Sequence, residues 1–298
     1  MWAPASWQSK SFVTTFPRTG TNFAFYNPSS STASITVSKN GTVEENFNLS
    51  SGSYIEKTYT HTNNAHWKIE SNQPILAFQW ASSTYDQANI PPPAKVWHGI
   101  VRNTRVICSE DNTSITIYFS DGTTESNADC DSTEVWSISR SGGTYGSGPS
   151  AKIVADKPVY AISYADGNGT ELQAWYSDED LDTEYLIPNN YDYLACSAPY
   201  DHTTITVYNL SGTQQTTSSD LGDNGANYPH HWKDSTGRSG GMRVVGDKPF
   251  YCYYEQAEQN DERNAANRVL NRKGTWPRPS VSSIAVSYTH LRAHETRH

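Results

Sequence analysis

The pattern of apolar and polar residues repeats three times along the chain. In each copy a basic residue and an Ile or Val begin a short alternating segment, and an Asn or Asp stands two residues before a proline. An apolar and aromatic run follows each proline, which predicts a strand buried on both faces. The prolines are Pro74, Pro158 and Pro249, spaced by 84 and 91 residues.

Each proline motif predicts a β-hairpin. The side chains of Asn72, Asp156 and Asp247 can bond to the backbone two residues on and so nucleate a turn. A proline is tolerated at the first residue of the strand that follows, because its missing N–H does no harm there. We therefore expect two strands that meet at each proline.

A second motif repeats on a matching period. Ile-Thr followed by Val or Ile begins at positions 35, 115 and 205, and a glycine follows six or seven residues later. This order predicts a strand, a glycine turn and a return strand in each copy. The glycines are Gly41, Gly122 and Gly212.

The repeat predicts an all-β fold of three tandem antiparallel modules of about 85–90 residues. We place them at 1–88, 89–172 and 173–262, and expect a fourth module to begin in 263–285. Each copy offers seven or eight short strands, which suits a sandwich-like module. The alternative is a six-bladed β-propeller with two blades per repeat.

Two further local predictions concern a helix and the cysteines. The segment Asp261–Leu270 suits a short helix. The four cysteines are too few for a disulfide framework, so we favour buried free thiols, with a Cys108–Cys130 bridge as the alternative.

The last thirteen residues, 286–298, differ from the rest of the chain. They show no β alternation and hold three of the nine histidines. They resemble the translation of a sequencing-library adaptor joined to a gene from a metagenome. We therefore leave them out of the fold prediction.

Charge and hydropathy limit the partners. The formal net charge is −9, and the basic residues are scattered. Binding to nucleic acid through phosphate neutralisation needs clustered Lys and Arg, so we expect no nucleic-acid partner. No apolar run approaches the roughly 20 residues that cross a bilayer, so we expect no membrane insertion.

The repeat resembles two kinds of protein. The segments Lys152–Ala165, Asp182–Pro188 and Thr203–Tyr208, with their copies, are similar to the repeats of the IgG-Fc-binding-protein N-terminal type and to virion structural or tail proteins of marine phages. The resemblance implies an extracellular or particle-surface repeat protein, with other virion or surface proteins and host glycans as partners. It brings no set of catalytic residues.

The acidic stretch between the second and third copies is a candidate metal site. Oxygen ligands at alternate positions with intervening glycines suit Ca²⁺. The alternative is a solvated acidic loop, and a glycosidase pair of carboxylates is a further one. The candidate ligands are Asp166, Asn168, Thr170, Glu171 and Asp178.

Aromatic residues beside histidines are candidate ligand-binding positions. Aromatic rings on loops can stack on sugar rings or on a partner surface. The alternative is packing in the core at a module junction. The candidates are Trp97, His98, Trp175, Tyr176 and Trp232.

These observations predict a non-enzymatic structural or adhesive protein of a virion, such as a tail or fibre component, or of a cell surface. A carbohydrate-binding or glycoside-cleaving module and a propeller-type interaction scaffold are the alternatives. No cofactor is required in this interpretation beyond the candidate calcium.

Overall fold

The computed structural model describes residues 7–16, 21–60, 64–81, 87–138, 140, 147–164, 172–257, 261–264 and 266–267. Within these ranges the chain is almost entirely β-strand and has no α-helix. Most of the predicted fourth module and all of 286–298 lie outside them.

The strands form three modules, and equivalent strands follow one another in the same order along the chain in each module. Module 1 holds β1 (Ser9–Phe16), β2 (Thr21–Tyr26), β3 (Ala33–Lys39), β4 (Thr42–Leu49), β5 (Tyr54–Tyr59), β6 (Ala65–Ala81) and β7 (Gln87–Ile90). Module 2 holds β8 (Ala94–Ile100), β9 (Asn103–Cys108), β10 (Thr113–Phe119), β11 (Thr124–Cys130), β12 (Val135–Ser137), β13 (Ser150–Tyr164), β14 (Leu172–Ala174) and β15 (Tyr176–Ser177). After the 3-10 turn η2 (Asp178–Asp180), module 3 holds β16 (Asp182–Ile187), β17 (Tyr191–Ala198), β18 (Ile205–Asn209), β19 (Gln214–Thr217), β20 (His230–Asp234), β21 (Met242–Gln256), β22 (Asp261–Asn264) and β23 (Ala266–Asn267).

One long strand organises each module. The first half of β6 pairs with β3 and β1, and its second half pairs with β2 and β7. Strands β13 and β21 repeat this arrangement with the equivalent partners. Each module is therefore a curled antiparallel sheet with two halves that share a strand. Since the halves are joined in this way, they are not separate propeller blades.

The core of module 1 lies between the two halves of its sheet. Phe23 on β2 contacts Trp67 on the first half of β6, with ring centroids 5.4 Å apart, and both side chains are fully buried. This face-to-face packing is the sandwich-like module predicted from the sequence.

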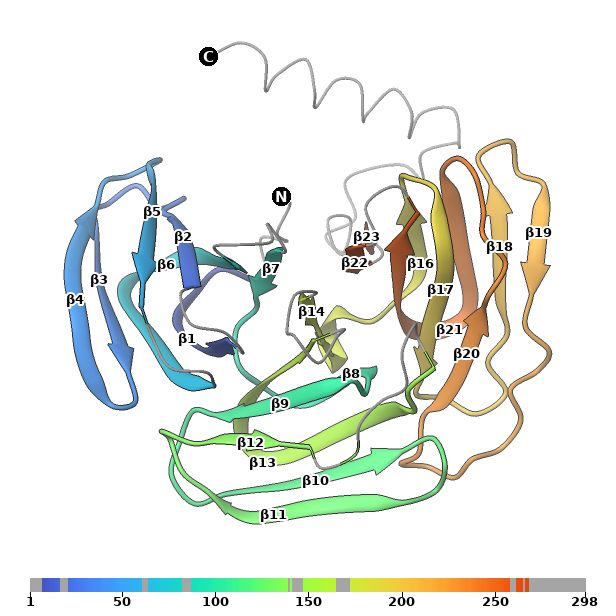
Figure 1. The fold of residues 1–298 in the computed structure, drawn as a ribbon, viewed down its shortest axis with the longest axis horizontal. Coiled ribbons are helices and arrows are strands. Elements are labelled where there is room, and N and C mark those ends of the chain that lie inside the picture. Colours follow the sequence, from blue (N-terminus) through green and yellow to red (C-terminus); the bar gives the residue numbers. More distant parts are fainter. Residues whose placement is uncertain are drawn as a thin grey trace.

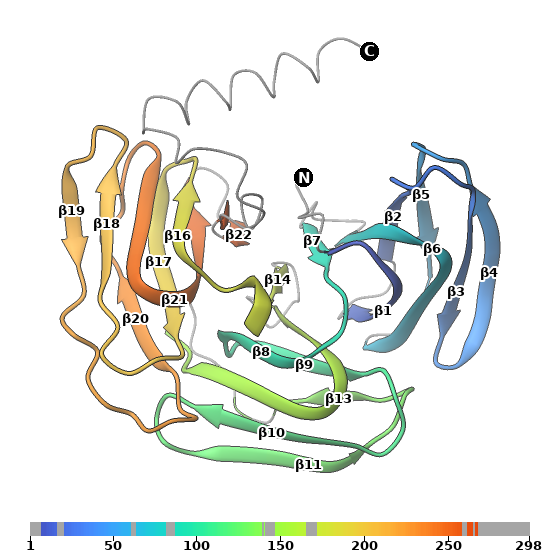
Figure 2. The ribbon, with the colours of Figure 1, turned by 180° about the vertical axis from the view of Figure 1, so that it is seen from behind.

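The three modules lie along an arc, with modules 1 and 3 at its ends (Figure 1). The outer hairpins β3–β4, β10–β11 and β18–β19 lie on the outer side of the arc, as the view from behind also shows (Figure 2). Strand β14 contacts both β7 and β22 near the centre. All three modules thus meet through their equivalent late strands.

The predicted hairpin at each proline is wrong, because the strand continues through it. The pairing of the long strand with the first strand of each module skips four residues, which are those between Glu70 and Ile75 in module 1. The same skip runs from Val154 to Val159 and from Val245 to Phe250. The prolines lie in these skipped segments and have no ladder partner themselves, so their missing N–H leaves no partner unsatisfied. The chain bends there and passes from one half of the sheet to the other.

The Asn or Asp of each motif holds this bend to a neighbouring strand. The backbone N–H of Ser34 donates to Asn72 Oδ1 at 2.8 Å, and that of Ser114 donates to Asp156 Oδ1 at 2.8 Å. The N–H of Thr204 donates to Asp247 Oδ1 at 2.8 Å in module 3. The side chain therefore anchors the bent strand to its neighbour and does not nucleate a hairpin turn.

The predicted glycine turns are confirmed, and the predicted strand buried on both faces is confirmed in modules 2 and 3 but not in module 1. Gly41, Gly122 and Gly212 adopt φ of +78°, +82° and +84° at the tips of the outer hairpins. In modules 2 and 3 the residues after the proline, 159–163 and 250–254, are all buried. In module 1 the same strand alternates between buried and half-buried residues.

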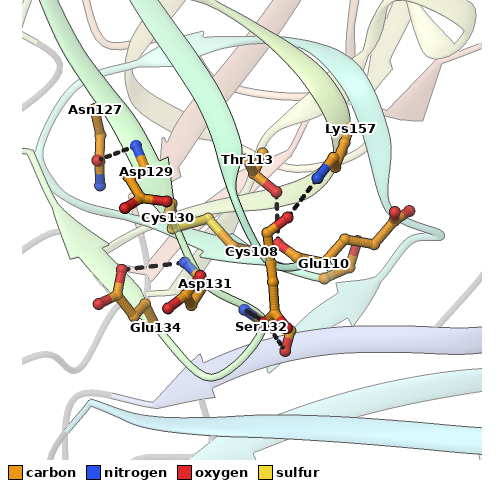
Figure 3. The surroundings of a disulfide bond; sticks show 12 residues. Cys108, Glu110, Thr113, Asn127, Asp129, Cys130, Asp131, Ser132, Glu134 and Lys157 are labelled. Atoms are coloured by element: carbon orange, nitrogen blue, oxygen red, sulfur yellow. Dashed lines mark hydrogen bonds between the residues drawn. A yellow bond between two sulfur atoms is a disulfide. The ribbon is translucent and has the colours of Figure 1, made fainter.

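The preference for free thiols is wrong, because all four cysteines form disulfides. Cys108 pairs with Cys130 and joins the ends of β9 and β11, beside two turns that Figure 3 shows linked by hydrogen bonds. Cys196 and Cys252 are directly opposite each other on β17 and β21, with Cα atoms 4.2 Å apart. Sequence separation alone gave no indication of this second pair.

Two further features differ from the sequence predictions. The segment expected to be a helix from Asp261 contains β22 and β23, because its residues pair with β21 and β16. Strands β7 and β15 also pair back to earlier strands. The strands of modules 1 and 2 therefore end at 90 and 177, a few residues after the predicted boundaries.

The anchor at the bend can be tested in module 2. We expect Asp156→Ala to lower the free energy of unfolding by about 1 kcal/mol, because Ser114 N–H loses its acceptor. Asp156→Asn keeps an oxygen at the same place, as Asn72 does in module 1, and is the matched control. Urea unfolding curves for both variants make the comparison, and equal losses would show that the side-chain oxygen is not the anchor.

Candidate functional site

The residues predicted to bind ligands gather at the junctions between modules. Strand β1 contacts β9 and β13, and β8 makes the equivalent contacts with β17 and β21. At the first junction Tyr160 donates from its hydroxyl to the Asn89 carbonyl, and at the second Tyr251 donates to the Ala174 carbonyl, each at 3.3 Å. Both tyrosines stand two residues after the proline, so the two junctions have the same construction.

Four of the five aromatic or histidine candidates meet where β15 pairs with β8. Tyr176 lies opposite His98, and Ser177 lies opposite Trp97. The ring of Tyr176 is 6.0 Å from that of Trp7 and 5.1 Å from that of Tyr251, centroid to centroid. This cluster therefore joins the N-terminal segment, module 2 and module 3.

The cluster forms part of the core. Trp97 and Trp175 are 0% exposed, His98 is 1% exposed and Tyr176 is 5% exposed. These rings offer no open face for a sugar, so the core-packing alternative describes their surroundings. Trp232 lies apart, half-buried on β20 opposite Cys196.

A glycine makes room for one of these rings. A Cβ atom on Gly99 would lie 2.2 Å from Cδ2 of Trp175, far inside van der Waals contact. The Trp175 indole N–H donates to Ser163 Oγ at 2.7 Å, and this bond holds the ring over the glycine. The β8–β15 pairing therefore requires a residue without a side chain at position 99.

Replacing this glycine tests the packing at the junction. We expect Gly99→Ala to destabilise the protein by about 2 kcal/mol or more, because a buried ring must move. Gly237→Ala is the control, since its Cβ would meet no atom closer than 3.6 Å. Thermal melting of both variants checks the prediction; a Gly99→Ala protein as stable as the control contradicts it.

His98 is buried and bonded to one of the acidic candidates. Its Nε2 lies 3.0 Å from Asp178 Oδ1, and the carboxylate accepts the N–H. Its Nδ1 has no hydrogen-bond partner among the described residues. Burial lowers the pKa of His98, and the hydrogen bond and charge of Asp178 oppose this only in part. His98 is therefore a neutral ring at neutral pH.

His66 has a similar place at the first junction. Its Nε2–H donates to the carbonyl of Cys108 at 2.9 Å across the junction. Burial again lowers the pKa of this ring, and the hydrogen bond to the carbonyl partly offsets the shift. The second junction has Ser150 at the equivalent position, and its hydroxyl lies 3.4 Å from the carbonyl of Cys196.

Acid should weaken both junctions. A lowered folded-state pKa means that the unfolded chain binds the proton first, so this stability is present above pH ~6.5 and is lost as the pH falls. We expect each histidine to contribute at most about 1.4 kcal/mol of loss per pH unit. His98→Gln and His66→Gln should each reduce the loss measured by urea unfolding at pH 7.5 and 5.5.

His202 provides a control, because its pKa is shifted in the opposite direction. It is exposed, and the hydrogen bond and charge of Asp220, with the charge of Asp223, raise its pKa. Its contribution to the free energy of unfolding is present at low pH and is lost as the pH rises. His202→Gln should therefore not reduce the acid loss; if His98→Gln and His66→Gln behave like it, the junction histidines do not control the pH response.

The remaining acidic candidates are not placed together by the structure. Asp166, Asn168, Thr170 and Glu171 lie outside the described residues. Asp178 begins η2, and its carboxylate contacts His98. Within the described ranges no group of three His, Cys, Asp or Glu side chains has a geometry for a metal ion. The calcium site stays a prediction.

His230 and His231 take part in separate polar contacts. His230 Nε2 lies 2.9 Å from Asp201 Oδ1, while the adjacent His231 bonds to Ser150 Oγ at 3.2 Å. The two rings thus have different neighbours, as expected for adjacent residues on a strand.

The sequence analysis missed several polar residues of the junctions. Arg102 donates to the hydroxyl of Tyr193, and Gln173 donates to the hydroxyl of Tyr251 at 2.5 Å. The sequence did offer one indication of the junctions, because a tyrosine stands two residues after both Pro158 and Pro249. Their equivalent in module 1 is Leu76, so this tyrosine occurs in modules 2 and 3 and not in module 1.

No protein-family model matches this chain, and no curated protein matches it. No helix among the described residues is long and apolar enough to cross a membrane.

Proposed function

We propose that this chain is a non-enzymatic structural or adhesive protein of a virion or cell surface, with a phage tail or fibre component as the leading case. The observation that carries the proposal is the joining of three copies of one module by buried, repeated junctions. Such a construction gives a fixed spacing to the outer hairpins. Fixed, repeated surfaces suit assembly or multivalent contact more than turnover of a substrate.

The disulfides support a location outside a reducing cytosol. Both bridges lie in buried positions at the ends or centres of strands, and all four sulfurs are paired. Structural disulfides persist in secreted, periplasmic and particle-surface proteins and are rare in the cytosol.

The outer hairpins supply the repeated contact surface. Thr36 bonds to Asn46 at 2.7 Å across the first hairpin, and Thr206 bonds to Thr217 at 2.9 Å across the third. Thr116 and Ser126 are the equivalent pair in the second. Rows of hydroxyl and amide groups on an exposed sheet can donate and accept hydrogen bonds, so we propose surface glycans or other surface proteins as their partners.

Binding to a glycan array, together with a hydrolysis assay, tests this function. We expect saturable binding by the oxidised protein and no release of product from labelled oligosaccharides. Replacing Asn46, Ser126 and Thr217 together by Lys should weaken binding far more than one replacement, since three linked sites bind more tightly than one.

The controls distinguish the alternatives. Gly237→Ala leaves the hairpins unchanged and should bind normally. Hydrolysis of a glycan would contradict the non-enzymatic proposal and favour a glycoside-cleaving module. Binding that the triple variant retains would remove the outer hairpins from the contact surface.

A further inference from the structure

Neighbouring modules also meet at the outer side of the arc. In each case, the loop that follows an outer hairpin reaches the tip of the preceding module's hairpin (Figures 1 and 2). The loop of module 2 is 131–134, and a Cβ atom on Gly41 at the first tip would lie 3.3 Å from Cγ2 of Thr133. The loop of module 3 is 218–229, between β19 and β20. We call these loops the first clasp and the second clasp.

The second clasp contacts module 2 through an amide and a ring. The Nδ2 of Asn224 donates to the carbonyl of Ser120, which follows β10, at 3.1 Å. The ring of Tyr228 meets that of Tyr118 on β10 edge to face, with centroids 5.5 Å apart. The position of this loop therefore determines whether module 3 holds the second hairpin tip.

His202 holds the start of the second clasp between two carboxylates. Its Nδ1 lies 3.1 Å from Asp220 Oδ2, and its Nε2 lies 3.1 Å from Asp223 Oδ1. A neutral imidazole has one N–H and one lone pair, and only the imidazolium form donates from both nitrogens. The two contacts can therefore be hydrogen bonds at the same time only while the ring carries its second proton.

The residue before His202 connects this site to the contact with module 2. Asp201 Oδ1 accepts from the backbone N–H of Asn224 and from Nε2–H of His230, each at 2.9 Å. The backbone carbonyl of Asp201 accepts from Nζ of Lys248 on β21. Both ends of the second clasp are thus bonded to the segment that carries His202.

Carboxylates dominate the charge around the His202 ring. The hydrogen bond and charge of Asp220 raise the pKa of His202, the charge of Asp223 adds to this, and the charge of Lys248 opposes it in part. The charge of Asp201 also acts on this ring. Because the folded-state pKa is raised, the bridging contacts are fully present below pH ~6.5 and are lost as the pH rises through the folded value.

We propose that the second clasp is a pH-controlled fastening between modules 2 and 3, which is closed while His202 is protonated and loosens when the ring becomes neutral. The neutral ring presents a lone pair to one of its two carboxylates, so that carboxylate moves away with its part of the loop. Asn224 and Tyr228 belong to the same loop, so their contacts with module 2 weaken as well. This device goes beyond the adhesive role and does not depend on it.

The first clasp provides a comparison within the same molecule. The backbone N–H and the hydroxyl of Ser132 both donate to Asp111 Oδ1, at 2.9 Å and 2.5 Å. The Cys108–Cys130 disulfide lies beside this loop (Figure 3), and 131–134 contains no histidine. Aspartate and hydroxyl groups keep their protonation state between pH ~6 and ~9. The first clasp should therefore not respond to pH in this range.

Hydrogen exchange of the full, oxidised chain between about pH 6 and pH 9, corrected for the intrinsic exchange rate at each pH, tests the device. We expect the protection of 218–229 to fall roughly threefold with rising pH, because ion pairs at a surface contribute little. The protection of 131–134 should stay constant. Photo-oxidative crosslinking reports the contact between modules, and the yield of the Tyr118–Tyr228 crosslink should fall as the second clasp loosens.

Two variants of His202 separate its charge from its shape. Arginine keeps a charge and can donate to both carboxylates at every pH, so His202→Arg should keep the protection and the crosslink at pH 9. His202→Gln has no charge and should be loose already at pH 6. His202 is exposed and has a φ of +56°, and both variants place the same Cβ atom there, so the backbone strain is matched.

The outcomes decide both parts of the inference. Wild-type protection of 218–229 that does not change with pH, or that falls equally in His202→Arg, overturns the control by His202. Protection that falls while the Tyr118–Tyr228 crosslink, measured against His202→Arg at each pH, stays constant overturns the fastening between modules 2 and 3.

Discussion

The bend in the long central strand is the constraint on which the rest of each module depends. Four residues leave the ladder with the first strand, and the strand then continues with new partners on both sides. Because one strand belongs to both halves, their relative position is fixed by covalent geometry. The Asn or Asp anchor sets where the bend occurs, and the core fills the space between the halves.

The same bend determines how modules meet. It turns the second half of the strand so that one face looks into its own module and the other looks toward the preceding one. Residues after the proline must then be apolar on both faces where a module precedes, as in 159–163 and 250–254. At the equivalent positions of module 1, Leu76 and Phe78 are half-buried.

The repeat, the all-β class and the glycine hairpins were predictable, because they depend on local alternation and turn chemistry. The bend was not, since an Asn or Asp before a proline is equally typical of a hairpin; only the partner strand shows that Asp156 bonds to Ser114. Likewise Cys196 and Cys252 are 56 residues apart, and only the register places them opposite each other. The meeting of Trp97, His98, Trp175 and Tyr176 was not predicted either, because it depends on the pairing of β15 with β8, and the burial of these residues depends on the adjoining module.

The disulfides are distributed unevenly along the arc, and this affects how the molecule responds to a pulling force. Modules 2 and 3 each contain one bridge, which keeps 22 and 56 residues of sequence from being drawn out while the bonds last. Module 1 contains no cysteine, so its whole length can extend. Under tension between its two ends, the first module could unravel completely, while the other two retained covalently closed loops.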